Sequence, residues 1–343
     1  MRIVKRVLFI IAILAIIYFV GPHPEKPVYT VTLPSIPDHA ESLIQYVNAI
    51  ESKHQIKPDN EARIVWNNDS LKNKTAYAIV YLHGFSASQE EGNPVHRNLA
   101  KQLGANLYLS RLSGHGIDTS DALLHMTATS LWETAKEAYA IGKQLGDKVI
   151  LMGTSTGGTL ALQLAATYPE IAGLVLLSPN IAINDPNAWI TNNPWGLQIA
   201  RLVKGGKMNI VPNKTETYKK YWNDQYRLEA VSELEELLET TMSKETFQKI
   251  KQPTLTLYYY KNEKEQDPVV KVSAMKKMFE QISTPASLKK MIPIPNAGNH
   301  VLGSPIQSKD VVTVEREALL FLKEVVGGGK VDVNSRWSID HSP

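Results

Sequence analysis

The residues best suited to chemistry in this chain lie in the segment Gly153-Thr154-Ser155-Thr156-Gly157. Four apolar residues, 149–152, precede the segment and predict a buried strand, and the small and apolar residues after it predict a helix. A serine in such a turn is typically held in a strained backbone conformation with its hydroxyl exposed. Gly153 and Gly157 suit the turn because no Cβ fits where a helix and a strand press together. The segment therefore predicts that Ser155 is a nucleophile.

A serine nucleophile needs a base that accepts its hydroxyl proton, and His300 is the candidate. On a parallel sheet that carries such a serine turn, the acid and the histidine follow the serine along the chain. Of the nine histidines, only His300 and His341 follow Ser155, and His341 lies in the C-terminal tail. His300 comes just after the last predicted strand, in a loop that can return it to the serine.

The base in turn needs an acid that orients it, and three carboxylates follow the predicted strand 254–260. They are Glu263, Glu265 and Asp267. Asp267 precedes Pro268, which starts the next predicted helix, so the position of Asp267 is restricted. The two glutamates lie in a charged loop and are expected to be solvated. We expect Asp267 to orient His300, and Glu265 is the alternative.

Two backbone amides are the candidate donors to the oxyanion of an acyl-transfer reaction. One belongs to Thr156, directly after the nucleophile and at a helix N-terminus, where the helix dipole favours negative charge. The other belongs to Phe85, in a loop that follows a predicted strand and begins with His83 and Gly84. We expect His83 and Gly84 to shape this loop. His115 is also expected to be structural, because it precedes the serine and a better base exists.

The order of the predicted elements places these residues on one sheet. Strand-like runs occupy residues 62–66, 77–82, 106–109, 148–152, 173–177, 254–260 and 288–294. Helical patterns occupy residues 38–50, 94–103, 130–145, 156–168, 268–281 and 311–325. This alternation predicts an α/β fold with a doubly wound, mostly parallel sheet, in one domain over residues 38–325. Residues 179–251 break the alternation, show no convincing strand and are interpreted as an inserted helical cap.

The N-terminal segment is basic and then apolar. Fourteen apolar residues, 7–20, follow Arg2, Lys5 and Arg6, which predicts a membrane anchor with the rest of the chain extracytoplasmic. The rival interpretation is a cleaved signal peptide, which would give a secreted or periplasmic protein. Fourteen helical residues reach only about 21 Å, and counting from Ile3 gives roughly 27 Å.

Two further segments are predicted to lie outside the core of the domain. Residues 21–37 contain five prolines and are interpreted as a linker. Residues 326–343 open with glycines, are mostly polar and are interpreted as a disordered tail.

These motifs together resemble those of the α/β-hydrolase superfamily. More narrowly, they are similar to its branch of monoacylglycerol lipases, carboxylesterases and lysophospholipase-like enzymes, which is sometimes grouped with serine aminopeptidases. The resemblance covers residues 62–325. It rests on the segments His83–Phe85, Gly114–Gly116, Gly153–Gly157 and Gly298–His300, and on Asp267 with the valines that follow it.

The resemblance implies an eight-stranded sheet with a helical cap after the sixth strand. It also implies a catalytic triad without a metal, and hydrolysis of small carboxylic esters or lipid acyl esters. Two departures from the usual pattern are present. Threonines flank the nucleophile in place of bulkier residues, and the loop of the acid is longer and more charged than usual.

The composition restricts the partners of the chain. A net charge of +3 over 343 residues gives no reason to expect nucleic acid. The chain has no cysteine, which excludes disulfides and thiolate metal sites. We expect a monomer without metal or cofactor that acts on a small-molecule or lipid ester.

A membrane-tethered serine ester hydrolase is the leading hypothesis, and a peptidase or an acyltransferase on the same fold is the alternative. A non-catalytic binding protein is disfavoured, because such proteins usually lose a member of the triad. Trp189 and Trp195 of the predicted cap suit either an acyl site or packing against the core. A peptidase needs fixed carboxylates that hold a substrate amine. The candidates are Glu233, Glu235, Glu236 and Glu239, but their spacing around one helix indicates a solvated face.

Overall fold

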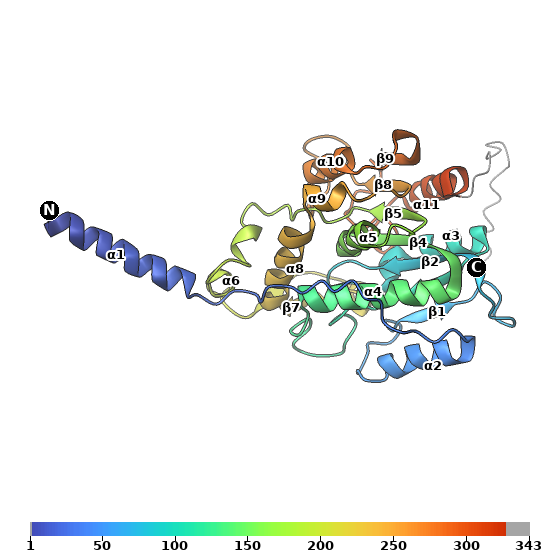
Figure 1. Cartoon of the computed structure of the whole chain (residues 1–343), viewed down its shortest axis with the longest axis horizontal. Coiled ribbons are helices and arrows are strands. Elements are labelled where there is room, and N and C mark those ends of the chain that lie inside the picture. The colour runs from blue at the N-terminus through green and yellow to red at the C-terminus, as the bar shows by residue number, and fades with distance from the viewer. Residues whose placement is uncertain (1, 327–343) are drawn as a thin grey trace.

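The centre of the computed structural model, which describes residues 2–326, is a seven-stranded sheet (Figure 1). The strand order is β1-β3-β2-β4-β5-β8-β9. The strands are β1 (Arg63–Val65), β2 (Thr75–Leu82), β3 (Asn106–Leu109), β4 (Gly146–Thr154), β5 (Gly173–Leu177), β8 (Thr254–Tyr258) and β9 (Lys289–Pro293). β1 pairs antiparallel with β3, and the other neighbours pair in parallel. The predicted α/β class with a mostly parallel sheet is confirmed.

Helices cover both faces of this sheet. They are α2 (Ala40–Glu51), α3 (Val95–Leu103), α4 (Ala128–Leu145), α5 (Thr156–Thr167), α10 (Val272–Gln281) and α11 (Val311–Phe321). The chain also forms short helical turns, namely η1 (Gln89–Gly92), η2 (Ala188–Ile190), η3 (Ala286–Leu288) and η4 (Leu322–Val326). Val80 and Leu82 of β2 pack into the cluster that holds α4 and α5. Ile79 and Tyr81 pack into the cluster that holds α3 and α11. Because successive side chains of a strand point to opposite faces, one apolar run contributes to two cores.

The sheet differs in size from the one that the resemblance implied. Within residues 2–326 it has seven strands rather than eight, and the cap follows its fifth strand rather than its sixth. The chain before β1 forms α2 and then turns, so it cannot extend the edge of the sheet. Ile56 pairs with Ile117 only as an isolated bridge, and Asp59 has a left-handed φ of 71°.

Residues 179–251, here called the cap, lie between β5 and β8. They contain α6 (Gly196–Lys204), α7 (Glu216–Tyr221), α8 (Leu228–Thr241), α9 (Lys244–Phe247), β6 (Met208–Ile210) and β7 (Gln225–Arg227). The cap is largely helical, but β6 and β7 pair antiparallel, so it also contains two strands that the sequence did not predict. Strands of three residues are too short to show the alternation by which a strand is recognised in a sequence. α6 lies on the far side of α8 from the sheet (Figure 1).

The prediction of a membrane anchor is wrong. α1 (Arg2–Phe19) projects away from the rest of the chain (Figure 1). Over the whole described range, residues 2–326, helices fall short of the length or the apolar character that a membrane crossing requires. α1 has 18 residues, and Arg2, Lys5 and Arg6 occupy its first turns. The extracytoplasmic placement, which depended on the anchor, therefore loses its basis.

The proline-containing stretch 21–37 runs along α4 (Figure 1) and is held there by hydrogen bonds. Trp132 Nε1 donates to the carbonyl oxygen of Thr30 at 2.8 Å, and Tyr168 donates its hydroxyl to that of Val31 at 2.8 Å. Lys136 is 1% exposed; its ammonium donates to the hydroxyl of Thr30 and, at 3.1 Å, to the carbonyl of Thr32. This stretch is thus packed against the domain along much of its length.

Replacement of Lys136 tests how much this packing stabilises the fold. We expect Lys136→Ala to lower the free energy of unfolding by about 2 kcal/mol, because it removes a buried side chain whose ammonium binds two oxygens of the stretch and pairs with Glu133 at 3.0 Å. The measurement is equilibrium unfolding in urea. Lys143→Ala on the same helix is the matched control, because Lys143 is partly exposed and its ion pair with Glu170 is expected to contribute less than about 1 kcal/mol. Equal losses in the two variants would contradict the expectation.

Candidate active site

Ser155 lies at the sharp turn between β4 and α5. Its φ of 53° and ψ of −117° fall outside the backbone regions that residues other than glycine favour, so the turn is strained. Neighbouring backbone groups hold it there. Ser155 N donates to the carbonyl of Leu177 at 3.0 Å, and its carbonyl accepts from the amides of Thr159 at 3.1 Å and Asn180 at 3.0 Å.

The two glycines of the turn have no room for a side chain. A Cβ on Gly157 would lie 1.9 Å from the carbonyl oxygen of Leu82, at the end of β2. A Cβ on Gly153 would lie 2.4 Å from the carbonyl oxygen of Gly157. The close approach of α5 to β2 and β4 therefore requires glycine at both positions.

His300 and Asp267 form a buried pair. His300 follows β9 and Asp267 follows β8, and His300 Nδ1 lies 2.7 Å from Asp267 Oδ2. The other oxygen of Asp267 accepts from the amides of Val269 at 2.9 Å and Val270 at 3.1 Å. Asp267 is 1% exposed and His300 7% exposed. The carboxylate is thus oriented from both sides.

The charges of the pair stabilise each other. Burial alone would raise the pKa of Asp267, but the charge of His300 and three hydrogen bonds outweigh it and hold that pKa below its usual value. Burial alone would lower the pKa of His300. The carboxylates of Asp267 and Glu91 outweigh burial, so the pKa of His300 lies above 6.5.

The alternative acids lie elsewhere. Glu265 is exposed and pairs with Lys261 at 3.1 Å. Glu263 accepts the hydroxyl of Tyr260 at 2.7 Å. The structure therefore brings Asp267 to His300, while both glutamates bond within their own loop.

His83 and His115 support the loop after β2. His83 Nε2 accepts from the amide of Leu112 at 3.0 Å, and its Nδ1 donates to the carbonyl of Gly84 at 2.9 Å. His115 Nε2 accepts from the amide of Ser86 at 3.0 Å. Burial lowers the pKa of His83 well below its usual value and that of His115 to about 4. Both rings are therefore neutral near pH 7 and link backbone segments.

The amide of Phe85 lies between two amides that are already bonded. Gly84 N donates to Glu91 Oε2 at 2.5 Å, and Ser86 N donates to His115. Among the partners available in residues 2–326, the Phe85 amide has none, and the same holds for the amide of Thr156 at the start of α5. Two backbone donors on neighbouring segments are thus left for a ligand.

A pocket of about 440 Å³ connects these groups. Ser155, His300, Phe85 and Glu91 all line it. The cap contributes aromatic and apolar side chains to its wall, namely Val211, Tyr218, Trp222, Tyr226, Val231 and Leu234. The pocket has the size and the mostly apolar lining that are typical of a small-molecule site.

Comparison with known proteins agrees with the fold. The model of a family described as alpha/beta hydrolase fold matches residues 77–199. A solved structure described under LipS and LipT, two metagenome-derived lipolytic enzymes, is similar with a TM-score of 0.63 at 18% identity, over 79% of this chain and 100% of that one. The chain therefore has the α/β-hydrolase fold, and residues 77–199 match the model of that family.

The chain is also similar in sequence to two curated proteins. A thermostable monoacylglycerol lipase of Bacillus sp. (strain H-257) is 33% identical over 109 residues, which are 32% of this chain and 42% of that protein. A pimeloyl-[acyl-carrier protein] methyl ester esterase of Citrobacter koseri is 31% identical over 112 residues, 32% of this chain and 40% of that protein. The matches thus span about two fifths of the length of these relatives.

Two expectations about the cap need correction. Trp189 and Trp195 are 55% and 38% exposed, and the tryptophan that lines the pocket is Trp222. The glutamates of α8 are not uniformly solvated. Glu235 is 9% exposed, and burial raises its pKa to about 7. Within the described chain, the pocket wall takes Val231 and Leu234 from this helix and none of its glutamates.

Glu91 is a charged residue of the site that sequence reasoning missed. It is 3% exposed although its neighbour Glu90 is half-exposed. In the sequence, both belong to a polar run after the strand of β2, and no periodicity separates them. The structure separates them, because η1 directs Glu91 into the site and leaves Glu90 half-exposed.

Proposed function

We propose that this chain is a serine hydrolase that cleaves carboxylic esters, with Ser155 as the nucleophile, His300 as the base and Asp267 as the acid that orients the base. The observation that carries the proposal is the buried His300–Asp267 hydrogen bond in a pocket that Ser155 also lines. The names of the matched relatives, a monoacylglycerol lipase and a methyl ester esterase, support ester substrates.

The proposed mechanism follows from the orientation of the imidazole. Nδ1 faces Asp267, so Nε2 is the nitrogen that can accept the proton of Ser155. The alkoxide attacks the ester carbonyl, and the amides of Phe85 and Thr156 stabilise the tetrahedral oxyanion. Protonated His300 then gives its proton to the leaving alcohol. Water, activated by the same histidine, attacks the acyl-enzyme and releases the acid.

The pocket wall favours an apolar acyl group. Its cap side is mostly aliphatic and aromatic, with Asn180 and Lys214 as its polar members, and Phe85 packs edge-on against Tyr226 with ring centres 5.0 Å apart. Burial of an acyl chain against such a wall contributes roughly 0.8 kcal/mol per methylene. We therefore propose esters with apolar acyl groups that fit into about 440 Å³.

A comparison of ester and amide substrates tests the proposed function. p-Nitrophenyl esters of increasing acyl length are compared with aminoacyl p-nitroanilides. We expect ester turnover whose kcat/KM rises with acyl length up to the capacity of the pocket, and anilide turnover at least about 100-fold lower. Faster hydrolysis of the anilides would favour the peptidase alternative and contradict the proposal.

The pH dependence of kcat/KM follows from His300. Only the neutral imidazole can act as a base, and the pKa of His300 lies above its ordinary value of 6.5. Activity is therefore complete above this raised pKa and is lost as the pH falls through it. We expect the acid limb of the pH profile above pH 6.5. A rate that stays constant down to about pH 5 would contradict the role of His300.

A further inference from the structure

A carboxylate of unassigned role lies beside the nucleophile. Glu91 belongs to η1, is 3% exposed and lines the pocket together with Ser155 and His300. Its Oε2 accepts from the amide of Gly84 at 2.5 Å. Burial of a carboxylate is costly unless it is paired or hydrogen-bonded, so its presence at this place calls for a reason.

Gly84 lies between Glu91 and Ser155, with little room for a side chain. A Cβ on Gly84 would lie 2.8 and 3.0 Å from the two carboxylate oxygens of Glu91, and 3.1 Å from Cβ of Ser155. Gly84 immediately precedes Phe85, whose amide is free. A shift of the Gly84 peptide therefore moves the Phe85 amide relative to the serine.

The cap reaches the same carboxylate through Trp222. Trp222 is 3% exposed, lines the same pocket as Glu91, favours the ionised form of that carboxylate and stacks on Tyr218 with ring centres 5.2 Å apart. The next residue, Asn223, donates its amide to the carbonyl of Ser86 at 2.8 Å. Two contacts thus join the segment after α7 to the loop that carries Phe85.

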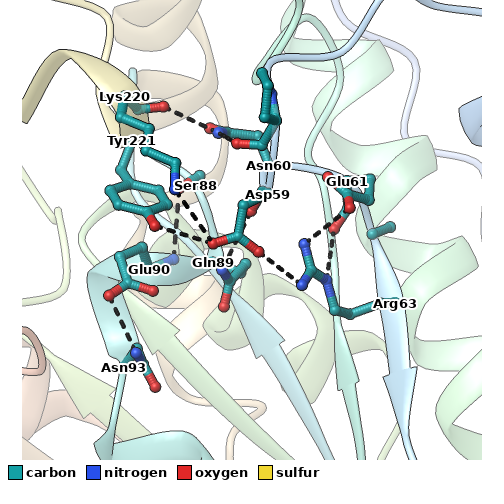
Figure 2. A network of polar contacts seen from close by, with 12 residues as sticks. Asp59, Asn60, Glu61, Arg63, Ser88, Gln89, Glu90, Asn93, Lys220 and Tyr221 are labelled. Atoms are coloured by element: carbon teal, nitrogen blue, oxygen red, sulfur yellow. Dashed lines mark hydrogen bonds and ion pairs between the residues drawn. The ribbon is translucent and has the colours of Figure 1, made fainter. Parts of the chain in front are cut away.

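The end of α7 is itself fixed to the body of the domain. Figure 2 shows Tyr221 directed at Asp59, with its hydroxyl donating to Oδ2 at 2.9 Å, and Asn60 donating to the carbonyl of Lys220 at 2.9 Å. The carboxylate of Glu90 points instead to Asn93, at 3.0 Å. Trp222 is therefore held in place when it contacts Glu91.

We propose that Glu91 is a positioning residue, whose buried carboxylate fixes the Gly84 peptide so that the Phe85 amide faces the oxyanion, and which ties this loop to the cap through Trp222. This inference rests on the proposed function. Glu91 acts through the backbone and takes no part in proton transfer.

The charge of Glu91 has a second, measurable effect. The titratable groups that face it are His300 after β9, Tyr81 on β2 and Tyr218 on α7. Burial raises the pKa of Glu91 to about 7, and its charge adds to that of Asp267 in raising the pKa of His300. Loss of the charge at position 91 therefore lowers the pKa of His300.

Three variants of the full chain test the proposal, with the rate of Ser155 phosphonylation by a fluorophosphonate and ester hydrolysis as readouts. Glu91→Ala removes the acceptor for Gly84, and we expect both the phosphonylation rate and kcat to fall about 100-fold while KM changes less than about threefold. Glu91→Gln keeps an acceptor oxygen, so we expect a loss below about tenfold and an acid limb shifted to lower pH. Glu90→Gln, the matched control on η1, is expected to behave as wild type.

The outcomes separate the inference from the proposed function. If wild-type Ser155 does not react with the probe, the proposed function fails. If wild type reacts and folded Glu91→Ala reacts equally fast, the positioning role is wrong. If Glu91→Ala does not fold, the isosteric Glu91→Gln decides, because a wild-type phosphonylation rate and kcat together with an acid limb at the wild-type pH overturn the inference.

Discussion

Asp267→Asn is expected to reduce kcat about 10⁴-fold while the fold is retained. Asp267 accepts hydrogen bonds from His300, Val269 and Val270, and an asparagine can replace only part of this pattern. The asparagine amide favours the imidazole tautomer with its proton on Nε2, and that nitrogen then cannot accept the proton of Ser155. The lost charge also removes the stabilisation of the imidazolium that forms during the reaction. Steady-state ester hydrolysis measures the effect.

Glu265→Gln is the control for this prediction. Glu265 was the alternative acid, and in the structure it is exposed and pairs with Lys261. We expect its replacement to leave kcat within about twofold of wild type, because an exposed ion pair contributes little. A loss in Glu265→Gln that equals the loss in Asp267→Asn would show that the carboxylate has been assigned to the wrong residue.

Gly157→Ala is expected to destabilise the protein by more than about 3 kcal/mol. A Cβ there would lie 1.9 Å from the carbonyl oxygen of Leu82 and 2.7 Å from that of His83. Both neighbours are backbone atoms, which cannot rotate away as a side chain can. The helix must separate from β2, and this also displaces the loop that begins at His83. The midpoint of urea unfolding measures the loss.

Gly206→Ala provides the comparison. A Cβ on Gly206 meets no atom within 4 Å, so we expect a change within about 0.5 kcal/mol. The pair distinguishes a steric requirement from a general effect of replacing glycine. If both variants unfold at the wild-type midpoint, α5 does not pack on β2 as the structure shows.

The sequence was sufficient to predict the parts of the fold that depend on local pattern and chain order. Ser155 stood out because a strand, a glycine turn and a helix are contiguous there. His300 followed by elimination, since one of the two histidines after Ser155 lies in the tail. The tail prediction for residues 326–343 falls essentially outside the described residues. The strand count was wrong because the eighth strand was expected from the resemblance alone. The chain before β1, around Ile56 and Asp59, turns and adds no strand to the sheet.

Contacts between distant segments could not be predicted from the sequence. Glu90 and Glu91 look alike in the chain, yet Glu91 is 3% exposed and accepts from the amide of Gly84, whereas Glu90 accepts from Asn93. Trp189 and Trp222 are likewise indistinguishable by type, yet the first is 55% exposed and the second 3%. The anchor prediction treated the basic residues as flanks of the apolar run, whereas Arg2, Lys5 and Arg6 all lie within the 18 residues of α1.

Site-mapped labelling of the full chain with a fluorophosphonate tests the central claim most directly. If His300 activates Ser155, mass spectrometry will find the phosphonyl adduct on the peptide that contains Ser155. Labelling will disappear in Ser155→Ala and slow at least about 1,000-fold in His300→Ala. An unlabelled Ser155 in folded wild-type protein, or a rate that does not change when His300 is replaced, would contradict the account.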